Sequence, residues 1–421
     1  TNLSGNTSEN GTTSTFNVAL QTAPSDNVTV SVSSDNNSEG TVSPSTLTFT
    51  PNNWSSTQTV TVTGVDDNST DGHKEYQISL SAADQVEVST LAGGSYGSTD
   101  DTGTSASFKN AYGITSDGTN LYVADSNDNK IRQIVISTGE VTTLAGSGTA
   151  GFADDNGTAA IFNSPQGITT DNTSLYVADS NNNRIRKIVI STGVVTTLAG
   201  SGTAGSADDN GTAASFGALD GITTDGTNLY VADYDNHKIR KIVISTGEVT
   251  TLAGTGTWGY EDSTDGTGNT AQFYNPKGIT SDGTNLYVTN KNKIRKIVIS
   301  TGEVTTFAGQ LTSGYTDATG TLARFNNPNG ITNDGTNLYV VDRSSQKIRK
   351  IVISTGVVTT LAGSGMMAFR DGAASTARFS NPEGIIRDGT NLYVTDRDNY
   401  MIRKIDLSVT ETADLSLHNL D

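Results

Sequence analysis

The chain has 421 residues, with 45 glycines, 7 prolines and no cysteine, and its formal net charge at pH 7 is −18. The lack of cysteine excludes disulfides, thiol catalysis and cysteine metal sites. The acidic balance disfavours nucleic acid and anionic lipid as partners, and no apolar run approaches the roughly 18 residues of a membrane span. Short apolar runs between Gly-rich turns favour an all-β protein over a disordered one.

Residues 1–84 contain short segments in which apolar and polar residues alternate, such as "NVTVSVSS" and "TQTVTVTG", separated by clusters of Gly, Asn and Asp. This pattern predicts a small antiparallel β-sandwich of about seven strands. The stretches "SENGTTSTFNVAL" and "EGTVSPSTLTFTPNNWSSTQTVTVTGVDD" resemble the Calx-beta-like and Ig-like modules of large exported bacterial proteins. The resemblance implies a spacer or an adhesive unit.

Acidic residues gather in the loop "GVDDNSTDGHKE" and near the start of the chain. Calx-beta modules bind Ca²⁺ with clustered carboxylates in their end loops, so the resemblance implies a calcium site. Its expected ligands are Glu9, Asp66, Asp67, Asp71 and Glu75. The loop lacks the EF-hand spacing, and a solvated acidic loop is the alternative interpretation.

Residues 85–409 repeat one unit, whose "LYV" triplet begins at Leu121, Leu175, Leu229, Leu286, Leu338 and Leu392. A unit reads like "GITSDGTNLYVADSNDNKIRQIVISTGEVTTLAG" and is followed by a polar connecting loop that contains a Phe. Each unit predicts four strands, "GIT", "LYVAD", "KIRKIVI" and "VTTLA", with a tight turn at Asp-Gly. Four antiparallel strands repeated six times predict a six-bladed β-propeller.

The sixth unit, "LYVTDRDNYMIRKIDLSVTETADL", lacks a copy of the final strand, and an equivalent segment precedes the first unit at Val86–Leu91. We expect this N-terminal strand to pair with the third strand of the last unit and so close the ring, which leaves no open sheet edge there. Residues 410–421 are then a C-terminal tail. The segments "SPQGITTD", "NPKGITSD", "LYVAD" and "NNNRIRKI" resemble NHL repeats over about residues 86–405, which implies a six-bladed NHL propeller.

Three kinds of residue recur in every unit, and recurrence favours structural roles because a ligand site usually breaks the symmetry. An acidic residue of each connecting loop is expected to cap its own loop, with a ring of Ca²⁺ ligands as the alternative: Asp100, Asp154, Asp208, Asp262, Asp317 and Asp371. A loop aromatic is expected to fill the space between blades: Phe108, Phe162, Phe216, Phe273, Phe325 and Phe379. The Asp after "LYVA" is expected to pair with the Arg of "IR", although blade four has Asn290 at the acidic position.

Other positions differ between units and are better candidates for a binding site. The residue before each "GI" opens the innermost strand, so six side chains should surround one mouth of the central channel: Tyr112, Gln166, Asp220, Lys277, Asn329 and Glu383. Aromatic residues of the connecting loops should lie on the same face, among them Trp258, Tyr260 and Tyr315. Together they favour a polar ligand such as a glycan or a peptide, and sequence drift on an exposed loop face is the alternative.

Catalysis has little support in the sequence. The three histidines are His73, His237 and His418, and no two of them are expected to share a metal. NHL-like lyases that amidate peptides need zinc-binding histidines in the propeller, and this one offers only His237. A G-x-S-x-G nucleophile elbow is also missing. We therefore expect a non-enzymatic protein.

The resulting hypothesis is an exported scaffold or adhesion protein of the bacterial cell surface or extracellular space, which binds a protein or a glycan through its propeller loops. One alternative is a fibre subunit whose partner is a second copy of the chain, joined by strand addition. A further alternative is a lyase or hydrolase that works at the channel mouth.

Overall fold

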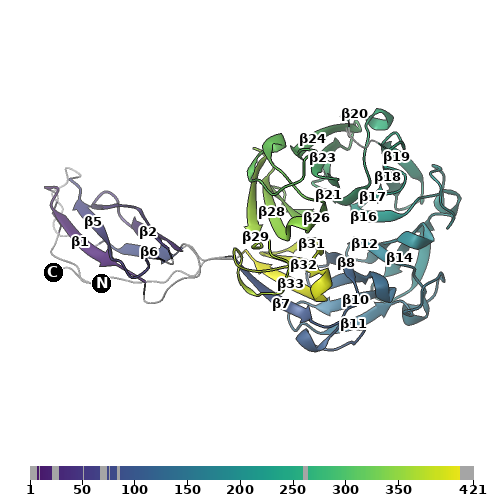
Figure 1. Cartoon of the computed structure of the whole chain (residues 1–421), viewed down its shortest axis with the longest axis horizontal. Helices are drawn as coiled ribbons and strands as arrows, with labels where there is room; N and C mark the ends of the chain where they lie inside the picture. Colours follow the sequence, from purple (N-terminus) through teal and green to yellow (C-terminus); the bar gives the residue numbers. More distant parts are fainter. Residues whose placement is uncertain are drawn as a thin grey trace. The chain divides into compact units, whose positions relative to one another are not determined.

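Figure 1 shows the computed structural model, which describes residues 7–8, 10–20, 28–50, 52–66, 74, 76–82, 86–258 and 264–407. Contacts divide the chain into two compact units, with the boundary between Val86 and Glu87. The elements of the described residues are β-strands and short 3₁₀ turns. In this part of the chain no helix is long and apolar enough to cross a membrane.

The first unit consists of two three-stranded antiparallel sheets, in the orders β1-β5-β3 and β4-β2-β6. The strands are β1 (Thr13–Val18), β2 (Val28–Ser34), β3 (Gly40–Ser43), β4 (Thr46–Phe49), β5 (Gln58–Gly64) and β6 (Ile78–Ala82). Alternate residues of both sheets bury one hydrophobic core, in which Phe16, Phe49 and Val60 are at most 1% exposed. The described residues of this unit thus hold six strands, where the sequence pattern predicts about seven.

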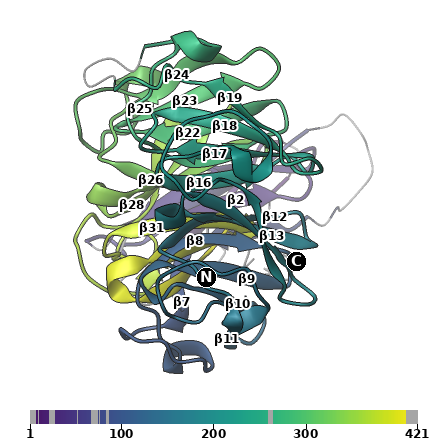
Figure 2. The ribbon, with the colours of Figure 1, turned by 90° about the vertical axis from the view of Figure 1, so that its right-hand side faces the viewer.

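The second unit contains six antiparallel sheets with four long strands each, here called repeat sheets 1 to 6. Sheet 1 has β8 (Ala111–Ser116), β9 (Asn120–Asp125), β10 (Lys130–Val135) and β11 (Val141–Ala145), and sheet 2 has β12 (Pro165–Thr170), β13 (Ser174–Asp179), β14 (Arg184–Val189) and β15 (Val195–Ala199). Sheet 3 has β16 (Leu219–Thr224), β17 (Asn228–Asp233), β18 (Lys238–Val243) and β19 (Val249–Ala253). Figure 2 shows these four strands in the order β16, β17, β18, β19, from the inner strand to the outer one.

Sheets 4 to 6 follow the same order and add a two-residue strand at the outer edge. Sheet 4 has β21 (Pro276–Ser281), β22 (Asn285–Asn290), β23 (Lys293–Val298), β24 (Glu303–Gly309) and the short β20 (Gly266–Thr267). Sheet 5 has β26 (Pro328–Asn333), β27 (Asn337–Asp342), β28 (Lys347–Val352), β29 (Val357–Ala362) and the short β25 (Ala318–Thr319). Sheet 6 has β31 (Pro382–Asp388), β32 (Asn391–Asp396), β33 (Met401–Asp406) and the short β30 (Gly372–Ala373), and its remaining strand is β7 (Glu87–Gly93).

Strand β7 comes from the beginning of the second unit and pairs with β33 from its end. The register runs from Glu87 opposite Asp406 to Gly93 opposite Met401. This segment supplies the strand that the last repeat lacks in its own sequence.

The first strands of the six sheets lie side by side around one axis, and β31 of sheet 6 packs against β8 of sheet 1 (Figure 1). The glycine of each "GI" pair makes this approach possible. A Cβ atom on Gly167 would lie 2.2 Å from the carbonyl oxygen of Asp220, and one on Gly384 would lie 2.3 Å from that of Tyr112. The Thr395 hydroxyl also donates a hydrogen bond of 2.8 Å to the Tyr112 carbonyl. Sheets 6 and 1 are therefore in contact through the same backbone approach as their neighbours.

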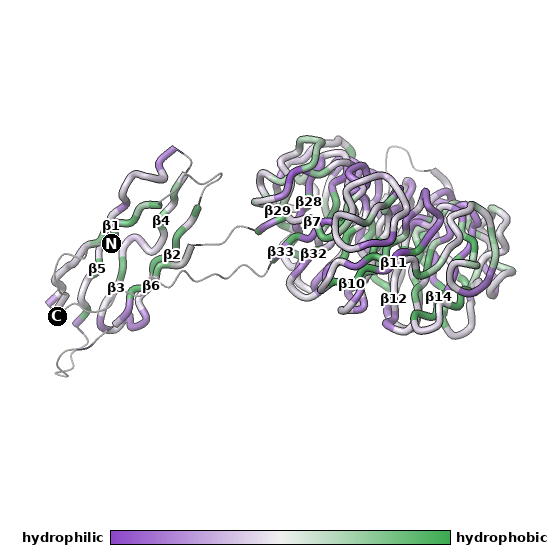
Figure 3. Tube along the Cα trace, turned by 90° about the horizontal axis from the view of Figure 1, so that it is seen from below, coloured by the Kyte–Doolittle hydropathy of each residue, from purple (hydrophilic) through white to green (hydrophobic). Residues whose placement is uncertain are grey.

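Hydrophobic cores fill the spaces between adjacent sheets. Phe162 follows sheet 1 in the chain and packs with Tyr122 and Ile131 of sheet 1 and with Leu175 and Val177 of sheet 2. All six loop phenylalanines are fully buried in this way, as their recurrence predicts: Phe108, Phe162, Phe216, Phe273, Phe325 and Phe379. Figure 3 shows hydrophobic stretches (green) alternating with hydrophilic ones (purple) along the tube of the second unit.

Each repeat sheet also buries one arginine completely, and Arg186 illustrates its contacts. Its guanidinium pairs with Asp179 at 2.8 Å and with Asp154 at 2.7 Å, and it lies 4.9 Å from the Phe162 ring centroid. Asp154 also accepts hydrogen bonds from the backbone and side chain of Thr197 in the outer strand β15. The prediction that this loop Asp caps its own loop is therefore wrong, because it ties the connecting loop to the arginine and to the outermost strand.

Repeat sheet 4 departs from this pattern. Asp262 lies outside the described residues, and Asp265 makes the equivalent contact with Arg295 at 3.0 Å. The reason is the longer connecting loop, whose three extra residues move the pairing position along the sequence. Asn290 replaces the buried Asp, so Arg295 has one carboxylate partner where the other five arginines have two.

Candidate binding site at the channel mouth

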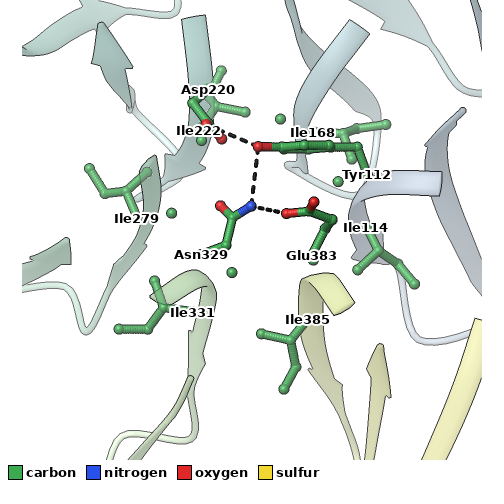
Figure 4. Close-up of a pocket in the computed structure, with 16 residues that line it drawn as sticks. Tyr112, Ile114, Ile168, Asp220, Ile222, Ile279, Asn329, Ile331, Glu383 and Ile385 are labelled. Atoms are coloured by element: carbon green, nitrogen blue, oxygen red, sulfur yellow. Dashed lines mark hydrogen bonds between the residues drawn. The ribbon is translucent and has the colours of Figure 1, made fainter. Parts of the chain in front are cut away.

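The residue before each "GI" glycine opens an innermost strand, and four of these six residues line one cavity on the axis: Tyr112, Asp220, Asn329 and Glu383 (Figure 4). The cavity encloses about 410 Å³ of space, including its open end. Its wall is completed by the six glycines and by a ring of isoleucines, each 5–6% exposed: Ile114, Ile168, Ile222, Ile279, Ile331 and Ile385. The cavity thus combines four polar side chains with an apolar wall.

A chain of hydrogen bonds crosses the mouth and joins residues of sheets 1, 3, 5 and 6 (Figure 4). The Tyr112 hydroxyl of sheet 1 donates to Asp220 Oδ2 of sheet 3 at 3.1 Å. The Asn329 amide of sheet 5 donates to the Tyr112 oxygen at 3.1 Å and to Glu383 Oε2 of sheet 6. Each polar group at the centre of the mouth thus has a protein partner.

Burial sets the protonation of these groups. Asp220 is 5% exposed, and burial raises its pKa to about 6, against the opposing charge of Lys277. Burial also raises the pKa of Glu383, opposed by Arg343, Arg397 and Lys277. The pKa of Tyr112 is raised well above its ordinary value by burial and then by both carboxylates, so Tyr112 stays a neutral donor.

Two arginines that the sequence analysis did not single out hold Glu383. Arg343 Nε and Arg397 Nη1 lie 2.8 and 2.7 Å from the same oxygen, Glu383 Oε1. The arginines begin the 3₁₀ turns η8 (Arg343–Ser345) and η9 (Arg397–Asn399), which join the second and third strands of sheets 5 and 6. The signal was present in the sequence, since sheets 1 and 2 have serine at the same position after "LYVAD".

The other two predicted mouth residues lie outside the cavity wall. Lys277 is half-buried and donates a hydrogen bond of 3.0 Å to Asn327 Oδ1, while its charge acts on both Asp220 and Glu383. Gln166 is half-buried, and its backbone carbonyl contacts Gly113.

Large aromatic side chains lie around the mouth on the connecting loops. Trp258 is 60% exposed and stacks on Tyr274 with ring centroids 5.9 Å apart, and Tyr315 is 65% exposed beneath the ammonium of Lys347. Tyr260, the third predicted aromatic, lies outside the described residues. We call the exposed set the aromatic rim: Tyr96, Phe152, Trp258, Tyr315 and Phe369.

The rim and the mouth belong to the same face of the second unit. Tyr96 packs edge-on against Tyr400, and Asn399 donates a hydrogen bond to the carbonyl next to Phe369. Both contacts are made by the turn after β32, which also carries Arg397 at the mouth. We call this face, with its second-to-third-strand turns, the loop face.

The calcium prediction falls mostly on residues that are not described: Glu9, Asp67, Asp71 and Glu75. Asp66 is described and exposed. Within the described ranges, no group of three His, Cys, Asp or Glu side chains is arranged to hold a metal ion.

His237 has a structural contact in the described structure, whereas His73 and His418 lie outside the described residues. Its Nδ1 accepts a hydrogen bond of 3.2 Å from the backbone N–H of Asn275 in the next repeat. Asn129 and Gln346 make the same contact at their own sheet junctions. Burial lowers the pKa of His237, partly opposed by Asp235, which keeps the accepting nitrogen unprotonated.

Residues 162–188 match the family model described as NHL repeat. The chain carries an NHL repeat. It is 30% identical over 318 residues to Protein SUPPRESSOR OF QUENCHING 1, chloroplastic, of Arabidopsis thaliana, a match that covers 70% of this chain and 30% of that protein. It is 27% identical over 325 residues to human NHL repeat-containing protein 2, covering 68% of this chain and 45% of that protein.

The chain thus spans less than half the length of these two relatives. Among solved structures, it is similar to an auxiliary nutrient binding protein from Bacteroides thetaiotaomicron, with a TM-score of 0.58, 18% identity and 94% of each chain covered. An identity this low supports a statement on the fold alone. The protein is all-β, and its NHL repeat region has a propeller-like fold.

Proposed function

We propose that the second unit is a closed six-bladed NHL propeller, that the first unit is a β-sandwich of the Calx-beta or Ig-like kind, and that the propeller binds another protein through its loop face. The pairing of β7 with β33 and the contact of Gly384 with the Tyr112 carbonyl support closure of the ring. The two sheets around one core support the sandwich. In this proposal the chain is a display module, and the NHL-repeat relatives and the nutrient binding neighbour are in keeping with a binding role.

The aromatic rim is the observation that carries the proposal. Scattered exposed apolar residues are normal on a protein surface, but clustered ones indicate an interaction site. Eleven large hydrophobic side chains are exposed in the described residues, and nine of them lie on the connecting loops. Aromatic residues and methionine, which Met366 and Met367 add here, are the residue types enriched at protein interfaces.

The mouth inside the rim favours recognition over acid–base chemistry. Its carboxylates already accept hydrogen bonds from Tyr112 and Asn329, and Glu383 is paired with two arginines. A non-enzymatic role is therefore part of the proposal. A polar centre ringed by aromatic side chains also matches the way in which interfaces combine fixed hydrogen bonds with large contact area.

We place the protein at the bacterial cell surface or in the extracellular space. This part of the proposal depends on the resemblance of residues 1–84 to modules of exported proteins. Fractionation of the source cells with an antibody to the chain tests it, and recovery in the cytosol alone would refute it.

The binding role is tested by removing the rim with residues that the repeats themselves use. Sheet 3 has Ala204 and Ser206 where other connecting loops have aromatics, so the variant Tyr96→Ala, Trp258→Ala, Tyr315→Ser should keep the fold. The matched control is Val194→Glu, Val357→Glu, which changes exposed apolar residues away from the rim to the Glu found at the same position in other repeats.

The full chain and both variants would be immobilised and challenged with surface proteins of the source cells. We expect one or more proteins to be retained by the wild type and the control and lost by the rim variant. Calorimetry with the purified partner should then give an affinity about tenfold or more weaker for the rim variant, since exposed aromatics contribute the largest share of interface energy. Equal affinity for the wild type and the rim variant would refute the proposal.

A further inference from the structure

One half of the channel mouth is rich in cationic donors. Lys277 comes from sheet 4, Arg343 from sheet 5 and Arg397 from sheet 6, whereas sheets 1 to 3 contribute Tyr112, Gln166 and Asp220. The three cations occupy positions that vary between repeats. Gln166 stands in place of Lys277 in sheet 2, and serine replaces both arginines in sheets 1 and 2. The repeat fold therefore does not require a cation at any of the three positions.

The arginines retain donors for a ligand. Both contact a single oxygen of Glu383, whose other oxygen accepts from Asn329. Arg397 Nε also donates a hydrogen bond to Asp398. In the described structure no protein group pairs with the Nη atoms of Arg343, whose Nε faces Glu383. The side chains of Arg343 and Arg397 are 22% and 24% exposed, against 1% for Glu383. The buried carboxylate thus orients two guanidinium groups whose outer edges reach solvent.

The charged groups of the site balance one another, so a bound anion would be held by direct contacts with the guanidinium groups and not by a net positive charge. Asp220, Glu383 and Asp398 balance the three cations when all six are ionised, in a chain whose net charge is −18. A dianion such as phosphate would meet repulsion from these carboxylates. The planar fork of a guanidinium instead matches the two oxygens of a carboxylate.

We propose that Arg343 and Arg397, assisted by the nearby charge of Lys277, form a subsite for one carboxylate group beside Glu383 on the loop face. An acidic side chain or the C-terminal carboxylate of the protein partner would bind there, inside the aromatic rim. The identity of the carrier depends on the proposed function, but the subsite itself does not, because a small carboxylate can occupy it alone.

The test uses the full chain with ¹³C-labelled isoleucine methyl groups, because Ile331 and Ile385 line the same cavity as Glu383, with which both arginines pair. Two probes are titrated at constant ionic strength with sodium chloride: N-acetylglycine for a chain terminus and the α-amide of N-acetylglutamate for an acidic side chain. Inorganic phosphate is titrated in parallel. We expect saturable shifts of the Ile331 and Ile385 methyl resonances with at least one carboxylate, and the tighter probe identifies the source of the group.

The decisive variant carries Arg343→Ser, Arg397→Ser and Glu383→Gln. Each new residue occurs at the same position in another repeat, as Ser126, Ser180 and Gln166. Because Glu383 is removed together with both arginines, no buried carboxylate is left without its partners. The control Arg387→Ser makes the same net change in charge at the other end of the inner strand. Affinity should fall about tenfold or more in the decisive variant, as expected for loss of charge-assisted hydrogen bonds, and stay unchanged in the control.

Equal shifts in the wild type and the decisive variant, or tighter binding of phosphate than of either carboxylate, would overturn the proposal. Should the decisive variant fail to fold, the carboxylate affinity of Lys277→Gln is compared with that of the wild type instead, since glutamine occurs at the same position of sheet 2 as Gln166. The two proposals fail separately. If the decisive variant loses carboxylate binding but still binds the protein partner, only this inference is refuted. If the wild type binds a carboxylate but retains no protein partner, only the proposed function is refuted.

Discussion

The six buried arginines offer a comparison within one molecule, because the repeat fold is the same and the partners differ. Arg240 contacts the fully buried Asp233 at 2.8 Å and the half-exposed Asp208 at 2.7 Å. Among the carboxylates of the described residues, Arg295 pairs with Asp265 alone, which is 52% exposed, since Asn290 replaces the buried carboxylate. We predict that Arg240→Met destabilises the protein more than Arg295→Met.

The magnitude follows from what each change leaves behind. Both variants leave two backbone carbonyls without their guanidinium donor, a loss of roughly 1–3 kcal/mol. Arg240→Met also leaves the buried Asp233 without its counter-ion, which brings the expected total to roughly 3–5 kcal/mol. The two variants should therefore differ by about 2 kcal/mol in the free energy of unfolding.

A double variant and the pH dependence isolate the buried carboxylate. Adding Asp233→Asn to Arg240→Met reproduces the natural Asn290 and should recover most of the difference. Burial already raises the pKa of Asp233, and removing Arg240 should raise it further. A carboxyl whose pKa is higher in the folded state costs stability as the pH rises from its unfolded value through its folded value. The deficit of Arg240→Met should thus be smaller at pH 4 than at pH 8.

The assay is urea unfolding followed by tryptophan fluorescence. The chain has two tryptophans, Trp54 in the first unit and Trp258 in the second. A Trp54→Phe background therefore reports on the repeat region alone. Equal losses for Arg240→Met and Arg295→Met, or a deficit that does not change with pH, would refute the reasoning that the buried ion pair sets the difference.

Three further predictions concern the sheet junctions and the mouth. Burial lowers the pKa of His237, so the wild type should lose stability as the pH falls below about 6.5. His237→Asn keeps an acceptor for the Asn275 N–H and should therefore lose less stability over the same pH range in calorimetry. An equal loss of stability with pH in both proteins would contradict this. Gly167→Ala should destabilise by about 1–3 kcal/mol, because its Cβ would lie 2.2 Å from the Asp220 carbonyl oxygen, and an unchanged melting temperature would exclude that approach. Tyr112→Phe removes the hydrogen bond that stabilises ionised Asp220, so a ¹³C NMR titration should find the pKa of Asp220 above about 6, and a lower value would contradict the network.

Much of the repeat region could be predicted from local sequence. Alternating apolar residues and Asp-Gly turns specify each strand within a few positions, and the copy of the last strand at Val86–Leu91 points to its partner. The paired Asp and Arg of five of the six units were also predictable, because their spacing recurs in the sequence. The connecting-loop Asp was assigned a wrong role since its partner, Thr197 in the second repeat, is 43 residues away.

The repeat, its strands and the positions that vary among repeats can all be predicted from the sequence, because they depend on neighbours within one unit. Which variable residues meet depends on how the sheets pack. Tyr112 reaches Asp220 across 108 positions, and Arg343 and Arg397 share Glu383, because the inner strands lie side by side around one axis and bring the same position of different repeats together. An insertion of a few residues likewise moved the pairing position from Asp262 to Asp265. Periodicity predicts where each strand runs, whereas the packing of the inner strands around the axis decides which side chains meet.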